Sequence, residues 1–180
     1  SKVNELSPNG FTPIVDTLYE ATMYYGGLDV DYGRKRGEPD VSSAVRRATR
    51  LSNRASYIGA DPVRPFGCDP SNLNDRDCEN EFIPQPATYI SPIQDLQCQT
   101  NNHIVLLSDG QANNNHSVSK IQNLLGQNCT GNGGERCGLN LVNNISNRET
   151  SVIDARVTTH TIGFAANATA NNFLNRLALQ

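Results

Sequence analysis

The stretch that decides the fold is His103-Ile104-Val105-Leu106-Leu107-Ser108-Asp109-Gly110. It is apolar almost throughout and ends on an aspartate followed by a glycine. A short apolar run of this kind predicts a strand buried on both faces, as in the interior of a parallel sheet. Asp109 then stands at the carboxyl end of the strand, where open α/β sheets bind their ligands.

A second segment, residues 9–16, places a hydroxyl group where it can meet Asp109. Thr12 directly precedes Pro13, and proline favours the first position of a helix. A hydroxyl and a carboxylate on neighbouring loops at one sheet edge suit a hard cation such as Mg²⁺ or Mn²⁺. The alternative role of Asp109 is to cap the turn that follows it, which an Asp-Gly pair does well.

These two segments resemble two of the three loops of the metal-ion-dependent adhesion site in von Willebrand factor A domains. The third loop of that family, Asp-x-Ser-x-Ser, has no counterpart upstream of Thr12. The closest run, Asp40-Val41-Ser42-Ser43-Ala44, is better explained as a helix N-cap at Ser42 or Ser43. The resemblance implies that residues 1–180 are the C-terminal two-thirds of such a domain. An N-terminal segment or a partner chain is then expected to complete the sheet.

The order of helices and strands predicts an α/β fold with a parallel sheet whose strands are joined by crossover helices. Two strands make this sheet partial, and the resemblance implies that it is doubly wound and Rossmann-like. Residues 27–101 are expected to form a long polar insert, with one short basic helix in it. The expected helices span 13–25, 41–53, 115–125 (capped by Asn115 or Ser117), 139–146 and 170–179, and the expected strands span 103–108 and 157–164.

Composition narrows the possible functions. A length of 180 residues fits one domain, and the net charge of −3 with scattered basic residues argues against nucleic-acid binding. No apolar run approaches the roughly 20 residues that span a bilayer. His103 and His160 are expected to be structural.

The five cysteines indicate disulfides and not a zinc site, because none forms a Cys-x-x-Cys pair. We expect Cys68 to pair with Cys78 and Cys129 with Cys137, since each pair brackets a short polar loop. Disulfides of this kind belong to exported proteins. Cys98 is either linked to a missing N-terminal part or a buried thiol. The acidic loop 69–79 is either an Asx-rich turn or a Ca²⁺ site.

A longer series of motifs resembles the A-type domain of type IV pilus tip adhesins and assembly factors of the PilY or PilC type. The resemblance runs from about Gly10 to Leu179. It is carried by the segments 10–26, 68–78, 89–93, 98–99, 105–110, 134–138 and 159–164.

This resemblance implies an exported, cell-surface pilus (fimbrial) protein that acts in attachment and pilus assembly without catalysis. Its partners would be pilus tip or minor pilin subunits and a host or surface ligand with an acidic group. Thr12 and Asp109 would share the divalent metal. The alternatives are a disulfide-stabilised structural module of a surface fibre with a non-functional metal site, and a metal-dependent hydrolase that uses Asp109 as its nucleophile.

Overall fold

The computed structural model describes residues 12–38, 42–72, 74–93, 102–108, 111–131, 134–164 and 167–180. These residues form a mixed α/β structure with five α-helices and two separate two-stranded sheets, one of them parallel. The chain divides into two units, 1–19 with 98–180, and 20–97. The second unit shares most of its residues with the expected insert, 27–101.

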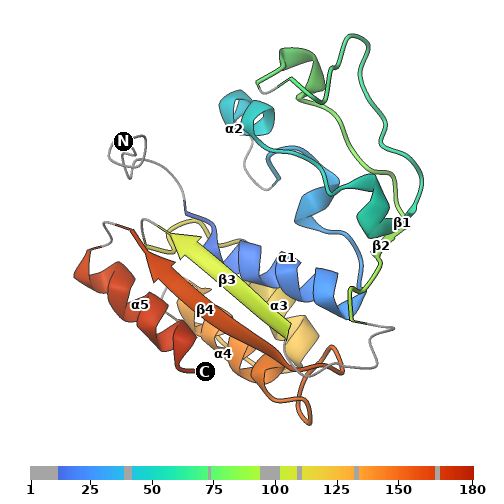
Figure 1. Ribbon diagram of the computed structural model, residues 1–180. Helices are drawn as coiled ribbons and strands as arrows, with labels where there is room; N and C mark the ends of the chain where they lie inside the picture. The colour runs from blue at the N-terminus through green and yellow to red at the C-terminus, as the bar shows by residue number, and fades with distance from the viewer. Residues whose placement is uncertain are drawn as a thin grey trace. The chain divides into compact units, whose positions relative to one another are not determined.

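The first unit is built on a parallel strand pair (Figure 1). Strand β3 (Asn102–Ser108) pairs with β4 (Val157–Gly163) over its whole length. Helices α3 (Val118–Leu125) and α4 (Glu135–Ser146) lie between the two strands in the chain. The predicted parallel pairing and the helical crossover are therefore confirmed.

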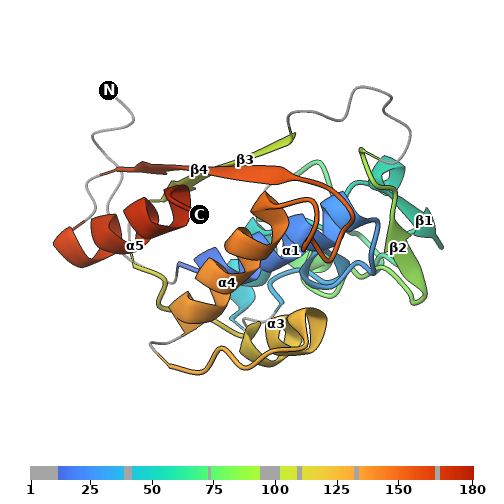
Figure 2. The ribbon, with the colours of Figure 1, turned by 90° about the horizontal axis from the view of Figure 1, so that it is seen from below.

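The helices of the first unit supply its core from one face of the strand pair. Both α4 and α5 (Ala168–Ala178) contact β4, and Figure 2 shows them on the same side of the two strands. A Cβ atom added at Gly138 of α4 would lie 3.3 Å from Cγ2 of Val15, which is close to the tightest contact that packed side chains tolerate. The buried apolar side chains of this unit include Val15, Leu18, Leu106, Ile121, Leu141, Val142, Ile145, Val157, Phe173, Leu174 and Leu177.

The expectation that the first strand is buried on both faces is wrong for the residues that the structure describes. Leu106 is 8% exposed, whereas Val105 and Leu107 are each 55% exposed. Successive side chains of a strand point to opposite faces, so helices on one side can cover only every second residue. Ile162 of β4 is 46% exposed on the same uncovered face.

Helix boundaries differ from the predictions by a few residues at most positions. Helix α1 spans Ile14–Gly26, and Gly27 follows it with a φ of +62°, a left-handed conformation that commonly ends helices. Helix α4 begins four residues before the predicted start at 139. The expected helix 41–53 is wrong in extent, because α2 covers only Ser43–Ala48 and Thr49 is already extended.

The second unit contains a small antiparallel sheet that the sequence analysis did not predict. Strand β1 (Tyr57–Gly59) pairs with β2 (Ala87–Tyr89). Single turns of 3₁₀-helix occur at Tyr32–Arg34, Arg54–Ser56 and Arg76–Cys78.

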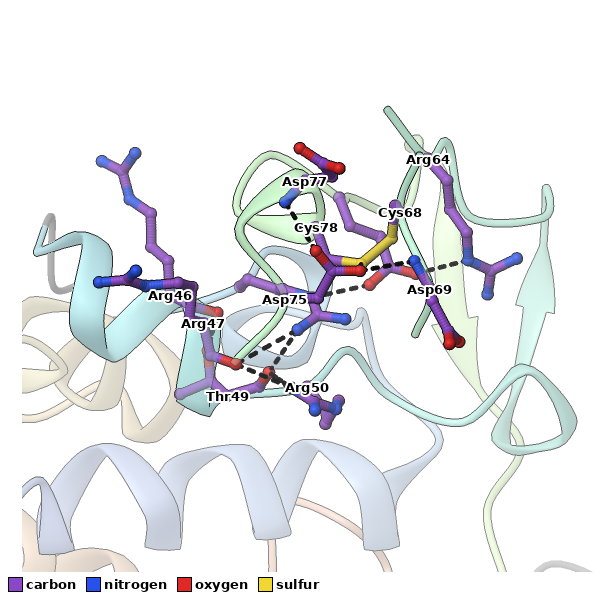
Figure 3. A network of polar contacts seen from close by, with 12 residues as sticks. Arg46, Arg47, Thr49, Arg50, Arg64, Cys68, Asp69, Asp75, Asp77 and Cys78 are labelled. Atoms are coloured by element: carbon purple, nitrogen blue, oxygen red, sulfur yellow. Dashed lines mark hydrogen bonds and ion pairs between the residues drawn. A yellow bond between two sulfur atoms is a disulfide. The ribbon is translucent and has the colours of Figure 1, made fainter. Parts of the chain in front are cut away.

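A buried ion-pair network stabilises the second unit, and Figure 3 labels three of its members, Arg47, Thr49 and Arg64. Nε of Arg36 donates to Oε2 of Glu81 at 2.8 Å, and Nε of Arg64 donates to Oε1 of Glu81 at 2.7 Å. Nη1 of Arg36 also donates to the backbone carbonyl oxygens of Arg47 at 3.5 Å and Thr49 at 3.2 Å. Arg36 and Glu81 are each only 3% exposed. Burial of either charge alone would be strongly destabilising, and the ion pair between them offsets this desolvation cost.

A second polar centre organises the start of the same unit. The carboxylate of Glu20 accepts hydrogen bonds from the backbone N–H groups of Asp31, Tyr32 and Gly33 at 3.2, 2.9 and 2.9 Å. It also accepts one from the hydroxyl of Tyr89 at 2.6 Å. Burial and this neighbouring carboxylate raise the pKa of Tyr89 well above its usual range. One carboxylate therefore holds a loop and a strand residue together.

Candidate functional site

The loop before α1 lies against the loop that follows β3. The backbone N–H of Thr12 donates to Oδ1 of Asn113 at 2.8 Å, across 101 positions of sequence. Thr12 itself precedes the helix, and the N–H of Ile14 donates to its carbonyl oxygen at 2.9 Å. The two loops that were expected to carry the hydroxyl and the carboxylate are therefore neighbours at the carboxyl end of β3.

Several residues of the predicted site lie outside the described residues. Asp109 and Gly110 are among them, as are Asp40, Val41 and Cys98. The predicted proximity of the Thr12 and Asp109 side chains therefore stays a prediction. Ser42 is described, and its side chain accepts from the N–H of Val45 at 3.2 Å. The N-cap interpretation of this run is confirmed.

A buried carboxylate that the sequence did not reveal joins α1 to the start of α3. Oδ1 of Asp16 accepts from the backbone N–H of His116 at 2.8 Å and from Oγ of Ser117 at 2.7 Å. Oδ2 of Asp16 lies 3.2 Å from Nδ1 of His116. Asp16 is 4% exposed and Ser117 is fully buried. We call these three residues the Asp16 clasp.

The Asp16 clasp explains why the two loops stay together. Ser117, one of the two expected capping residues, is at the N-cap position of α3, but its hydroxyl donates to Asp16 and does not cap its own helix. Asp16 is thus an anionic acceptor at the N-terminal end of α3, where negative charge is favourable. The only available sequence signal was an aspartate in the first turn of the helix after Thr12. Asp16 and His116 are 100 positions apart, so the sequence does not show that they are in contact.

An open hollow of about 490 Å³ adjoins this junction. Asn113, which binds Thr12, is one of its lining residues. The wall is made of small and polar residues, namely Ala112, Asn113, Asn115, Val118, Thr130, Gly131 and Gly134. Such a surface can accept a polar group beside the loop junction.

Among the described residues, the junction offers one side-chain oxygen that is not used in a hydrogen bond. No described residue hydrogen-bonds Oγ1 of Thr12, so this oxygen is available as a ligand. The carboxylate of Asp16 and Oδ1 of Asn113 are already used by hydrogen bonds within the site. Among the described residues there is no group of three or more His, Cys, Asp or Glu side chains placed to hold a metal. The assignment of Asp109 as the charged ligand therefore stays a prediction.

Both predicted disulfides are confirmed. Cys68 bonds to Cys78 and Cys129 bonds to Cys137, closing loops with sequence separations of 10 and 8. Bonds of this kind persist in oxidising environments, which is consistent with the expected export of the protein.

The acidic loop between Cys68 and Cys78 contains Asx turns, as expected for an Asx-rich loop. Oδ1 of Asp69 accepts from the N–H and the hydroxyl of Ser71 at 3.0 and 2.6 Å, and these bonds lower the pKa of Asp69. Asp75 accepts from the N–H groups of Asp69 and Asp77 at 2.8 and 3.0 Å. Both carboxylates therefore bind groups of their own loop.

The chain has no match among protein-family models, curated proteins or solved structures. The resemblance to pilus adhesins accordingly remains a hypothesis carried by the motifs alone. In the described part of the chain, no helix has the length and apolar character needed to cross a bilayer.

Proposed function

We propose that this chain is a cell-surface binding module of a type IV pilus tip adhesin or pilus biogenesis factor. In this proposal it has a von Willebrand factor A-like, doubly wound fold, and it binds its ligand through Mg²⁺ or Mn²⁺. Thr12 and Asp109 are metal ligands, and an acidic group of the ligand takes an open position on the ion. The module itself catalyses no reaction.

The observation that carries this proposal is the hydrogen bond between Thr12 and Asn113. It joins the loop with the candidate hydroxyl to the loop that begins with Asp109, at the edge where parallel sheets bind ligands. The Asp16 clasp holds the same two loops together by a second set of bonds. The two disulfides support an exported protein.

The chemistry needed from the residues is modest. Thr12 contributes a neutral oxygen and Asp109 a charged one, and a hard cation binds both. When bound, the ion would supply positive charge to attract the acidic group of the ligand. The clasp keeps the loop 111–117 from moving away from Thr12, so the two ligands do not have to be brought together at the moment of binding.

Substitution of both ligands in the intact protein tests the proposal. Asp109→Ala should reduce Mg²⁺ and Mn²⁺ affinity by at least about tenfold, because it removes the charged ligand of a hard cation. Thr12→Val should weaken binding and Thr12→Ser should retain it, since only the first removes the hydroxyl. Titration calorimetry measures binding, and a surface-attachment assay measures function. Asp154→Asn, an exposed carboxylate of the same unit, is the matched control.

The outcomes separate the proposal from its alternatives. If Asp109→Ala binds metal and attaches like the parent, the metal site is not formed by this residue. If the parent binds neither Mg²⁺ nor Mn²⁺ but still assembles into the surface fibre, the structural-module alternative is correct. Far-UV circular dichroism controls for loss of fold.

We also propose that a further segment or partner chain covers the apolar part of the open face of the β3–β4 pair, toward the carboxyl ends of the two strands. Support comes from Val105, Leu107 and Ile162, three large apolar side chains between 46% and 55% exposed. Val105→Asp should then destabilise the intact protein or its complex by several kcal/mol, because it buries an unpaired charge. If the face is open to water in the intact protein, the same change will alter the free energy of unfolding by less than about 0.5 kcal/mol.

A further inference from the structure

Two histidines of the first unit meet on the uncovered face of the β3–β4 pair. Nδ1 of His103 lies 2.9 Å from Nε2 of His160, and the ring centroids are 5.0 Å apart. His103 is opposite Thr158 in the register, so His160 is its diagonal neighbour two residues along β4. Both rings are exposed. Sequence alone did not bring them together, because they are 57 positions apart.

The spacing of these two nitrogens is that of two ligands on one metal ion. Two imidazole nitrogens about 2.05 Å from the same ion are about 2.9 Å apart when the N–metal–N angle is about 90°. At the tetrahedral angle they are about 3.3 Å apart. The observed 2.9 Å is the length of the hydrogen bond between the two rings, and it equals the separation of adjacent ligands on a square-planar or tetragonal ion. Both rings must turn slightly so that their lone pairs point at the ion. A tetrahedral ion needs a separation larger by about 0.4 Å.

We propose that His103 and His160 form a two-imidazole chelate for a late first-row divalent cation, Cu²⁺, Ni²⁺ or Zn²⁺. Neutral imidazole is a good ligand for these ions, whereas Mg²⁺ and Mn²⁺ prefer oxygen. We expect Cu²⁺ to bind most tightly of the three, because nitrogen ligands generally bind Cu²⁺ more tightly than Ni²⁺ or Zn²⁺. Cu²⁺ also prefers the square-planar or tetragonal arrangement that the 2.9 Å separation matches. This site is distinct from the one that Thr12 and Asp109 would form at the loop junction.

The strand pair makes the chelate by holding both rings in place. Parallel pairing over seven residues fixes the relative position of the two backbones. The ligands are therefore preorganised, and binding costs less conformational entropy than it would on a loop. Without a metal, one of the two facing nitrogens carries the proton of their hydrogen bond. When the ion binds, this proton moves to the other nitrogen of the same ring, the one that faces away from the ion. The two imidazoles therefore bind the ion without releasing a proton to solvent.

The ion would keep open coordination positions, because the protein supplies two ligands only. Water fills these positions in the chain alone. A site of this kind holds an ion more weakly than a structural zinc site, where four protein ligands close the shell. The affinity is therefore expected to be measurable but reversible.

The experiment is a Cu²⁺, Ni²⁺ and Zn²⁺ titration of the intact protein, prepared without a histidine tag. One equivalent of Cu²⁺ should bind, and its electron paramagnetic resonance spectrum should show two equatorial nitrogen ligands. His103→Gln and His160→Gln should each weaken binding by at least about tenfold, since one of two metal–nitrogen bonds is lost. Arg148→Gln is the control, because Arg148 is an exposed side chain of the same unit outside both candidate sites, and it should bind Cu²⁺ like the parent.

Several results would overturn the chelate. These are no bound Cu²⁺ in the parent, a spectrum with one nitrogen ligand or none, equal affinity in the two histidine variants and the parent, or loss of binding in Arg148→Gln. The spectrum of the parent does not depend on any variant, so the proposal remains testable even if a variant folds poorly. Excess Mg²⁺ should not displace Cu²⁺ from this site.

Discussion

Replacement of Asp16 by alanine should destabilise the first unit by about 2–4 kcal/mol. The substitution removes the acceptor of the buried Ser117 hydroxyl at 2.7 Å and of the His116 N–H at 2.8 Å. A buried donor left without its acceptor costs about 1–3 kcal/mol, and two donors are affected here. The estimate is below a simple doubling because alanine also removes the desolvation cost of a carboxylate that is 4% exposed.

Asp16→Asn should cost less, about 1 kcal/mol, because it keeps an oxygen that can accept both bonds and loses only the charge. The two substitutions together therefore separate the loss of the acceptors from the loss of the charge. Glu149→Ala, an exposed carboxylate of the same unit, is the control and should change stability by less than about 0.5 kcal/mol.

Urea unfolding followed by circular dichroism measures these free energies, and amide hydrogen exchange measures the local effect. Protection should fall first in α3, whose N-terminus the clasp holds. A double-mutant cycle between Asp16→Ala and Ser117→Ala should give a coupling energy of at least about 1 kcal/mol, because the two side chains are in contact. A cost below about 1 kcal/mol for Asp16→Ala, or a coupling energy near zero, would refute the clasp.

Three further predictions concern other parts of the chain. Gly33→Ala should lower the urea midpoint by the equivalent of about 1–3 kcal/mol, because the new Cβ would stand 1.9 Å from Oγ of Ser52. Joint replacement of Cys129 and Cys137 by serine should lower the free energy of unfolding by about 2–3 kcal/mol, because the disulfide restricts the conformational entropy of a loop of this length in the unfolded chain. An unchanged free energy of unfolding would contradict this prediction. The pKa of Tyr89 is raised, so the neutral form is favoured in the folded state. The free energy of unfolding that Tyr89 contributes should be complete below about pH 10, where the tyrosine of the unfolded chain is still neutral, and should fall as the pH rises further. This fall in the free energy of unfolding should be smaller in Tyr89→Phe.

The parts of the fold that were predicted correctly depend on short-range patterns. The apolar run of β3 and the β-branched run of β4 identify strands without any tertiary information, and the intervening helical sequence makes a parallel crossover the natural connection. The disulfides were predictable for a similar reason. Each pair of cysteines closes a polar loop of ten residues or fewer, and few other pairings are local.

The parts that were missed depend on contacts between distant residues. A continuous apolar run has no alternation, so it does not reveal which face of β3 the helices cover. Strands of three residues, such as β1 and β2, carry too little pattern to be distinguished from a loop. Asp16 resembles an ordinary first-turn aspartate until the structure places Ser117 and His116 beside it.

The two candidate metal positions of the first unit should be separable in one experiment, because they offer different donors. Thr12 and Asp109 present oxygen, which Mg²⁺ and Mn²⁺ prefer, whereas His103 and His160 present nitrogen, which Cu²⁺ prefers. Titration with Mn²⁺ after saturation with one equivalent of Cu²⁺ should therefore find the oxygen site still available. If prior Cu²⁺ abolishes Mn²⁺ binding, the two ions share ligands, and at least one of the two assignments is wrong.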